Sequence, residues 1–172
     1  MKLKSHFKVW FILFIVASCY TKANAWGVWA HKRINRVAVF TLPSPMNKFY
    51  KANIEYLTEH AVDPDKRRFT DDKEAPHHYL DIDHYGKYPY DSLPHKWYDA
   101  VAKYTEDTLN AYGVVPWHIA LVYKWLVKAM KEKNATDILR LSADLGHYVG
   151  DSYVPLHATE NYNGQMTGQT GI

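Results

Sequence analysis

Apolar residues recur every three or four positions along several stretches of this chain, and that period sets the strongest limit on its fold. In the last such stretch Ile138, Leu141 and Leu145 fall on one face of a helix, because a helical turn takes 3.6 residues. No stretch shows the convincing alternation of apolar and polar residues that marks a half-buried strand. The sequence therefore predicts an all-α fold, with helices over residues 30–40, 46–61, 97–112, 116–133 and 135–150.

Residues at the ends of these stretches support the predicted boundaries. Pro116 suits the first turn of a helix, and Asn134 is a typical N-cap. Segments 62–94 and 154–172 are rich in Asp, Pro, His and Tyr, and we expect them to be functional, metal-binding loops between helices. Three aromatic residues of the fourth predicted helix are expected in the core: Trp117, Tyr123 and Trp125.

Residues 1–25 have the parts of a secretory signal peptide. A basic start precedes an apolar run over residues 9–17, about half the ~20 residues that a membrane-spanning helix needs. Ala-Asn-Ala at 23–25 then has the small-x-small form of a signal peptidase site. We therefore expect a secreted or periplasmic protein whose mature chain, residues 26–172, is one domain beginning with Trp26.

A bacterial lipobox is the alternative interpretation of the same segment. The sequence Val-Ala-Ser-Cys at 16–19 fits it, and lipidation of Cys19 would tether the protein to a membrane as a lipoprotein. Only cleavage before Trp26 frees the amine of that tryptophan. Cys19 is the sole cysteine, so the mature chain has no disulfide, and a bound metal is one candidate source of stability.

The formal charge of +3 belongs to the leader. Four lysines and no acidic residue precede Trp26, so 17 of the 21 basic side chains remain against 18 acidic ones, a net charge of −1. The mature chain therefore gives no electrostatic support for binding a polyanion.

The most informative string of residues runs from His147 through Asp151 to His157. His147 and Asp151 stand four positions apart on a predicted helix, so both side chains leave the same face. Pro155 ends that helix, and His157 can return from the following loop. Two imidazoles and one carboxylate suit zinc, although a histidine–aspartate pair on a helix surface has the same spacing.

A second group of potential ligands lies upstream. It contains Asp63 and Asp65, and then the segment 77–84 with its three histidines and two aspartates. A solvated acidic loop with turn-forming aspartates is the alternative for any single member. His60, His95 and His118 have no comparable pattern of partners, and we expect His118 to be a packed or capping histidine and not a ligand.

Taken together, these strings resemble one superfamily, the zinc-dependent phospholipases C and the single-strand-specific nucleases of fungi and plants. The resemblance runs from Trp26 to about residue 164, and its most specific part is the HxxxDxxxxxH string. It implies an all-α fold with three zinc ions in a cleft.

The resemblance also implies roles for individual residues. Trp26 would bind one zinc through its free amine and backbone carbonyl, and His31 would share that ion. Asp151 would bridge it to a second zinc. That second ion would also take His78, His147 and an upstream aspartate, which we assign to Asp65 with Asp63 as the alternative. His157 would be the first ligand of the third ion.

The third zinc needs a further histidine and an acidic residue four positions after it. Residues 161–172 contain no His, Asp or Glu, so the third site is incomplete in this sequence. We therefore expect the domain over residues 26–172 to be truncated at its C-terminus, as in an incomplete gene, and its activity to be reduced or lost.

The resulting functional hypothesis is zinc-dependent hydrolysis of phosphodiester bonds. A zinc pair lowers the pKa of bound water far below its value in bulk solvent, towards about 7, and Asp65 would orient or deprotonate the attacking water as the catalytic residue. Phospholipid and single-stranded nucleic acid are the two candidate substrates, and no protein partner is expected. The alternatives are an exported non-catalytic zinc-binding helical protein and an inactive fragment of the enzyme.

Overall fold

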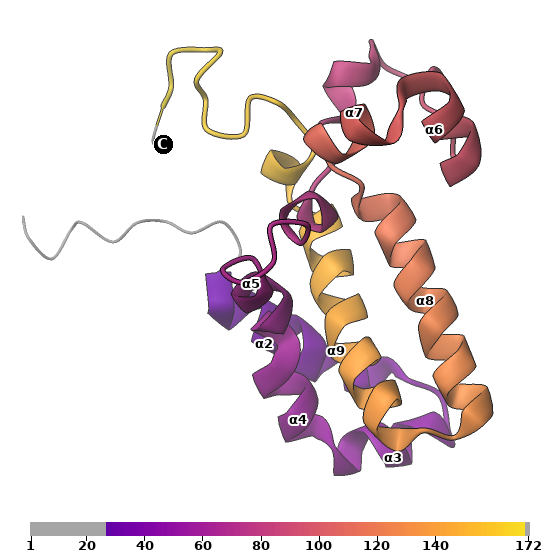
Figure 1. The fold of residues 1–172 in the computed structure, drawn as a ribbon. Helices are drawn as coiled ribbons and strands as arrows, with labels where there is room; N and C mark the ends of the chain where they lie inside the picture. Colours follow the sequence, from indigo (N-terminus) through magenta and orange to yellow (C-terminus); the bar gives the residue numbers. More distant parts are fainter. Residues whose placement is uncertain (1–26, 171–172) are drawn as a thin grey trace, which may run out of the picture.

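The computed structural model describes residues 27–170, which form α-helices and short 3-10 helices without a β-strand (Figure 1). Helices α8 (Val115–Glu132) and α9 (Ala135–Ser152) lie side by side in antiparallel orientation, joined by a short turn. Their shared core contains Val122, Leu126, Leu141 and Tyr148. The predicted all-α fold class is therefore confirmed for the described part of the chain.

The boundaries of the two long helices follow from local signals. The Asn134 side chain accepts a hydrogen bond from the backbone N–H of Asp137 at 3.2 Å, as expected of an N-cap. Pro116 lies in the first turn of α8, where its missing N–H leaves no helical hydrogen bond unmade. Both boundary predictions are confirmed.

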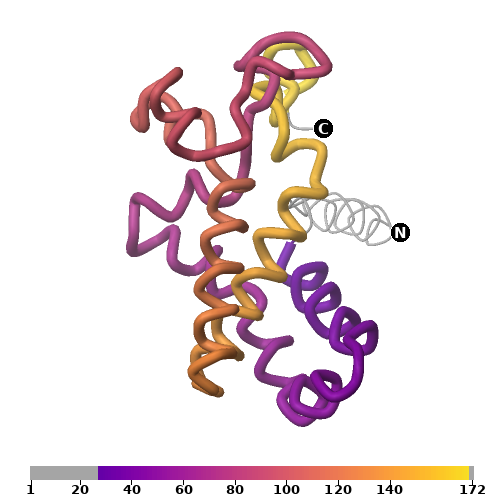
Figure 2. The backbone as a smooth tube through the Cα atoms, turned by 90° about the vertical axis from the view of Figure 1, so that its right-hand side faces the viewer, coloured from indigo at the N-terminus to yellow at the C-terminus, as the bar shows by residue number. Residues whose placement is uncertain are grey.

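A second layer of helices packs on the other side of α9 (Figure 2). It consists of α2 (Gly27–Ala38), η1 (Val39–Thr41), α3 (Met46–Ala52) and α4 (Ile54–Glu59). The buried Asn35 side chain joins these helices, because its Nδ2 donates to the carbonyl oxygens of Ala143 at 3.0 Å and Leu57 at 3.4 Å. Close contact between α2 and α9 is what later allows their side chains to share a site.

Two predicted helices are each divided in the structure. The stretch 46–61 breaks at Asn53, between α3 and α4, and ends in η2 (His60–Val62). The stretch 97–112 becomes α6 (Trp97–Tyr104) and α7 (Glu106–Ala111). At the second break Thr105 has a φ of 69° and accepts a hydrogen bond from the N–H of Thr108, so it starts a new helix in another direction.

The prediction of loops over residues 62–94 is partly wrong. The segment contains α5 (Asp63–Arg67), η3 (Ala75–His78) and η4 (Ile82–Tyr85). Each is one or two turns long, too short to show an apolar period in sequence. The later segment 154–172 has only η5 (Pro155–His157) among its described residues.

Backbone hydrogen bonds fix the segment that carries η3. Val114 N–H donates to the Pro76 carbonyl at 2.7 Å, and Val115 N–H to the Tyr79 carbonyl at 3.1 Å. Gly113 permits this approach: its φ is 86°, and a Cβ there would lie 2.2 Å from the Tyr79 carbonyl oxygen. The start of α8 thereby holds the histidine-bearing segment against α9.

The expected burial of the α8 aromatics is wrong for two of the three. Tyr123 and Trp125 are 57% and 46% exposed. Trp117 is partly buried against the core, and its Nε1–H donates to the His95 carbonyl at 2.9 Å. The spacing of apolar residues shows which side chains share one face of a helix. Whether that face is buried depends on which other segments pack against it.

Candidate metal centre

Six side chains from five elements meet at the C-terminal half of α9. We call them the histidine–aspartate cluster: His31 from α2, Asp65 from α5, His78 from η3, His147 and Asp151 from α9, and His157 from η5. The one-turn separation of His147 and Asp151 on α9 was readable from sequence. The spacing of the other four along the chain does not place them on that face, and only the resemblance implied that they would meet there.

Asp151 lies at the middle of this cluster. Its Oδ1 atom is 3.3 Å from His31 Nε2 and 3.6 Å from His157 Nδ1. Its Oδ2 atom is 2.9 Å from His78 Nδ1 and 3.1 Å from His147 Nε2. The two oxygens of one carboxylate therefore face two different pairs of imidazoles.

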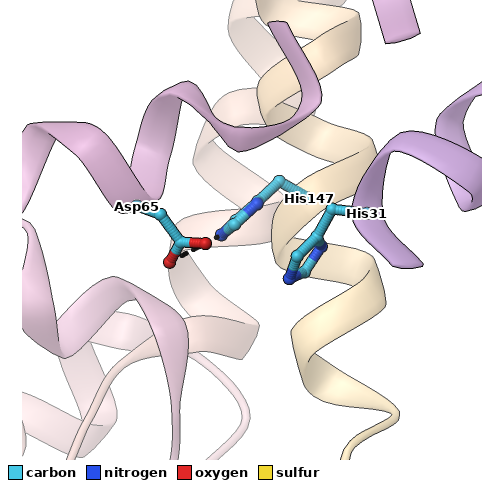
Figure 3. Close-up of side chains that lie close together, drawn as sticks. All are labelled: His31, Asp65 and His147. Atoms are coloured by element: carbon cyan, nitrogen blue, oxygen red, sulfur yellow. Dashed lines mark ion pairs between the residues drawn. The ribbon is translucent and has the colours of Figure 1, made fainter. Parts of the chain in front are cut away.

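The structure separates the two candidate aspartates of α5. Asp65 Oδ1 lies 3.8 Å from both His78 Nδ1 and His147 Nε2. Figure 3 shows Asp65 and His31 on opposite sides of the His147 ring. Asp63 instead contacts His60 at 2.5 Å and Lys66 at 2.7 Å, outside the cluster.

Neighbouring groups orient the imidazole rings. His147 Nδ1 lies 2.8 Å from the Ala61 carbonyl oxygen, which accepts its proton and leaves Nε2 free towards the cluster. His157 Nδ1 lies 3.0 Å from the His78 carbonyl oxygen, and this same nitrogen is the one that faces Asp151. The His31 ring stacks on that of His147, with 4.0 Å between the centroids.

The cluster is buried at its centre and open at one edge. His31, His78, His147 and Asp151 are each at most 3% exposed. The side chains of Asp65 and His157 are 39% and 27% exposed. Solvent therefore reaches this group of donors past Asp65 and His157.

The electrostatics favour a charged Asp151. Burial opposes its ionisation, but hydrogen bonds from His147, His31 and His78 outweigh burial and hold the pKa of the carboxyl well below its usual range. The pKa of His78 is shifted in the opposite direction. Burial alone would lower it, but the carboxylates of Asp151 and Glu74 outweigh burial, so the net effect is a raised pKa. A cation among these imidazoles would replace the protons that now pair with Asp151.

Two sets of donors in the cluster could hold a metal ion. One set is His31, Asp65 and His147, and the other is His78, His147 and Asp151; the ligand atoms within each set lie within 4.8 Å of one another. Nitrogen and carboxylate oxygen donors in this number fit zinc, so the residues present suit that ion. Because both sets use His147, two ions together would need Asp151 Oδ1 or His157 as additional donors.

The expected third zinc site has no counterpart within residues 27–170. His157 belongs to neither set of donors. Trp26, which the resemblance assigns to the ion of His31, lies outside the described residues, as do Cys19 and the predicted signal peptide.

A buried polar network beside the cluster was missed in the sequence. Glu74 and Asp144 are 6% and 5% exposed and share the Arg67 guanidinium, whose Nε is 3.3 Å from Glu74 Oε2 and whose NH2 is 3.2 Å from Asp144 Oδ2. The Tyr148 hydroxyl donates to Glu74 Oε1 and accepts from Arg67 at 3.0 Å. No sequence pattern distinguishes these residues from solvated charges, because their partners are up to 81 positions apart.

These contacts shift the pKa of several members of the network. Burial alone would raise the pKa of Glu74, but contacts with His77, His78, Tyr148 and Arg67 bring it well below its usual range. Burial raises the pKa of Asp144, and Arg67 only partly offsets this. Burial and the Glu74 carboxylate raise the pKa of the Tyr148 hydroxyl above its usual value.

A separate cavity of about 570 Å³ lies beyond this network. His77 and His118 line it, together with Trp97, Trp117 and Lys124, and no residue of the histidine–aspartate cluster does. The rings of His77 and His118 stack with 3.6 Å between centroids, and burial lowers the pKa of His118 to about 4. His118 is therefore a packed, neutral side chain, as expected from its sequence.

Within residues 27–170 no helix is both long enough and apolar enough to cross a membrane. Comparisons of the chain with protein-family models, with curated proteins and with solved structures find no match.

Proposed function

We propose that this protein is a zinc-dependent hydrolase of phosphodiester bonds and that the histidine–aspartate cluster is its active site. The main support is the position of Asp151, a buried carboxylate whose two oxygens face different pairs of imidazoles. A carboxylate placed in this way can join two metal ions, and paired ions are typical of enzymes that cleave phosphate esters.

The open edge of the cluster favours catalysis over a purely structural metal. Structural zinc sites are closed by protein ligands, whereas catalytic sites keep one position for water or substrate. Asp65 and His157 are the exposed members, so a substrate would approach past them.

The residues of the chain have distinct parts in this proposal. Zinc supplies a Lewis acid that lowers the pKa of water and neutralises charge on a phosphoryl group. Asp151 would hold the ions, and His31, His78 and His147 would offer nitrogen donors to them. Asp65, at the exposed edge, orients the attacking water and accepts its proton.

Phospholipid and single-stranded nucleic acid are the two candidate substrates. Both contain the phosphodiester that the proposed chemistry requires, and the resemblance covers enzymes of both kinds. The described residues have no feature that separates the two, so the assay must include both.

The test replaces the central carboxylate. Asp151→Asn keeps the shape of the side chain but removes its charge, so it should lose bound zinc and hydrolysis together. Asp137→Asn, in the first turn of the same helix and outside the cluster, is the matched control and should keep both. Metal content and cleavage of phosphatidylcholine, single-stranded DNA and a nitrophenyl phosphodiester are the measurements. Full turnover by Asp151→Asn would exclude this mechanism.

A non-catalytic zinc-binding protein is the second candidate. It is favoured by the near-complete burial of His31, His78, His147 and Asp151, since structural sites exclude solvent. It predicts one tightly held zinc per chain and no hydrolysis of any of the three substrates. More than one zinc together with cleavage would favour the enzyme.

A further inference from the structure

His78 presents a different ring nitrogen to the cluster from His147. His147 donates its Nδ1 proton to the Ala61 carbonyl and directs Nε2 inward. His78 directs Nδ1 inward, 2.9 Å from Asp151 Oδ2 and 3.1 Å from His147 Nε2. A neutral imidazole carries its proton on one nitrogen only, so His78 can bind an ion through Nδ1 only when Nε2 keeps the proton.

The Glu74 carboxylate faces that second nitrogen. Glu74 Oε1 lies 3.5 Å from His78 Nε2 at an ion-pair distance, somewhat longer than a good hydrogen bond. Nε2 is buried and makes no hydrogen bond to any described residue. Glu74 is also buried, so it is in position to accept the Nε2–H in place of water.

Arg67 and Tyr148 hold Glu74 in place. The Tyr148 hydroxyl donates to Glu74 Oε1, and Arg67 Nε donates to Oε2. Arg67 is itself fixed by Asp144, at 3.3 Å from its NH1. A carboxylate accepts about four hydrogen bonds, so these two donors leave capacity for His78.

We propose that Glu74 is a positioning residue of the metal centre: it accepts a hydrogen bond from His78 Nε2–H and so fixes the tautomer in which Nδ1 binds the ion. This inference rests on the proposed zinc centre and adds a residue that its motifs do not contain. A carboxylate behind a ligating histidine also strengthens the nitrogen as a donor.

The first test reads the tautomer directly. Long-range ¹H–¹⁵N NMR of the histidine side chains distinguishes Nδ1–H from Nε2–H in the wild-type chain, with and without zinc. We expect His78 to keep its Nε2 proton when zinc binds, and zinc to displace the Nδ1 proton that faces Asp151 and shift the Nδ1 resonance. Zinc on Nε2, or loss of the Nε2 proton in the zinc-bound chain, would overturn the proposal.

The second test measures zinc affinity by competition with a chromophoric chelator. Glu74→Ala should weaken zinc binding by about 10- to 100-fold, and Glu74→Gln by less, because its amide oxygen still accepts a hydrogen bond. Glu160→Gln is the matched control, since Glu160 also contacts a histidine, His84, at 2.7 Å but outside the cluster. Its zinc affinity should stay within about threefold of wild type.

The outcomes separate this inference from the proposed function. Tight zinc binding by the wild type with unchanged affinity in Glu74→Ala would reject the role of Glu74 and leave the zinc hydrolase standing. A wild-type chain that binds no zinc would reject both. If Glu74→Ala loses its helical circular dichroism, the role of Glu74 is decided by the zinc affinity of Glu74→Gln and by the His78 tautomer in the wild-type chain.

Discussion

Two aspartates of α5, two positions apart, have different surroundings, and only the motif resemblance favoured Asp65 over Asp63 as the ligand. Asp65 faces His78 and His147, whereas Asp63 pairs with His60 and Lys66 on the surface. Asp65 directly precedes a run of basic residues and was the assigned ligand, whereas Asp63 precedes Pro64 and was the alternative. Their direction depends on how a five-residue helix sits against α9.

A matched pair of substitutions follows from this difference. Asp65→Asn should weaken zinc binding by roughly 100-fold or more, because even partners outside the ligand set change affinity by 10- to 100-fold. Asp63→Asn should leave zinc affinity unchanged and cost at most about 1 kcal/mol of stability, the value of an exposed ion pair. Equal zinc affinities in a chelator competition would contradict the placement of Asp65.

Asp81 and Asp83 give a prediction about pH. Burial, followed by the charges of Asp83 and Glu160, raises the pKa of Asp81 to about 6. The folded chain then binds this proton more strongly than the unfolded chain, so ionisation of Asp81 destabilises the fold as pH rises from about 4 through 6. Asp81→Asn should therefore raise the melting temperature at neutral pH and have little effect near pH 4. Because Asp81 is partly exposed, we expect a gain of about 1 kcal/mol.

Asp83 should behave in the opposite sense. Burial opposes its ionisation, but hydrogen bonds from the Thr159 hydroxyl and the Glu160 N–H outweigh burial and lower its pKa. Asp83 therefore stabilises the fold when ionised, and this contribution is lost as pH falls through its lowered pKa. Asp83→Asn should lower the melting temperature at neutral pH. Thermal unfolding of both variants that shows the same sign at neutral pH would contradict this account.

At the scale of elements, the contact between α2 and α9 determines whether the cluster can form. Gly146 lies at this contact: a Cβ there would be 2.0 Å from Asn35 Oδ1 and 2.9 Å from Asn35 Cγ. Asn35 cannot move freely, because its Nδ2 donates to carbonyl oxygens on both α9 and α4. The glycine therefore allows His31 on α2 to reach His147 on α9.

Gly146→Ala should destabilise the protein by about 1–3 kcal/mol, the usual cost of overpacking a well-packed contact. Gly150→Ala on the same helix is the control, because its Cβ would make ordinary contacts, 3.4 Å from His31 Nδ1. An alanine in a helix interior is otherwise favoured over glycine by about 0.5–1 kcal/mol, so this control should unfold at the same or a higher temperature. Equal stability of the two variants in thermal unfolding would argue against the close approach of α2 and α9.

At the scale of the whole molecule, the cluster joins segments far apart in the chain. Its members run from His31 to His157 and come from α2, α5, η3, α9 and η5. Towards the C-terminus of the chain, Thr159 contacts Asp83 and Glu160 contacts His84, so this segment lies beside η4 (Figure 2). An ion held by these donors would therefore crosslink most of the fold.

Zinc should accordingly raise the melting temperature. A ligand that binds only the folded state stabilises it by about 2.7 kcal/mol at 100 times its dissociation constant. A chelator should reverse the shift, Mg²⁺ should not produce it, and Asp151→Asn should not show it. Unfolding curves that coincide with and without zinc would contradict a metal centre in this position.

The sequence by itself determined the fold class and the starts of the two long helices. The period of apolar residues gave the all-α class, and Pro116 and Asn134 marked the helix starts that the structure has. The four-residue spacing of His147 and Asp151 placed both on one face of α9, because helix geometry repeats identically along the chain. Such features depend on neighbours within one or two turns.

The tertiary structure decided which of these faces meet. It turned Asp65 rather than Asp63 towards the histidines, stacked His31 on His147, and left Tyr123 and Trp125 exposed. It also assembled Arg67, Glu74, Asp144 and Tyr148 into a buried network. Each of these outcomes depends on close packing between segments tens of residues apart, and the spacing of residues along the chain does not encode it.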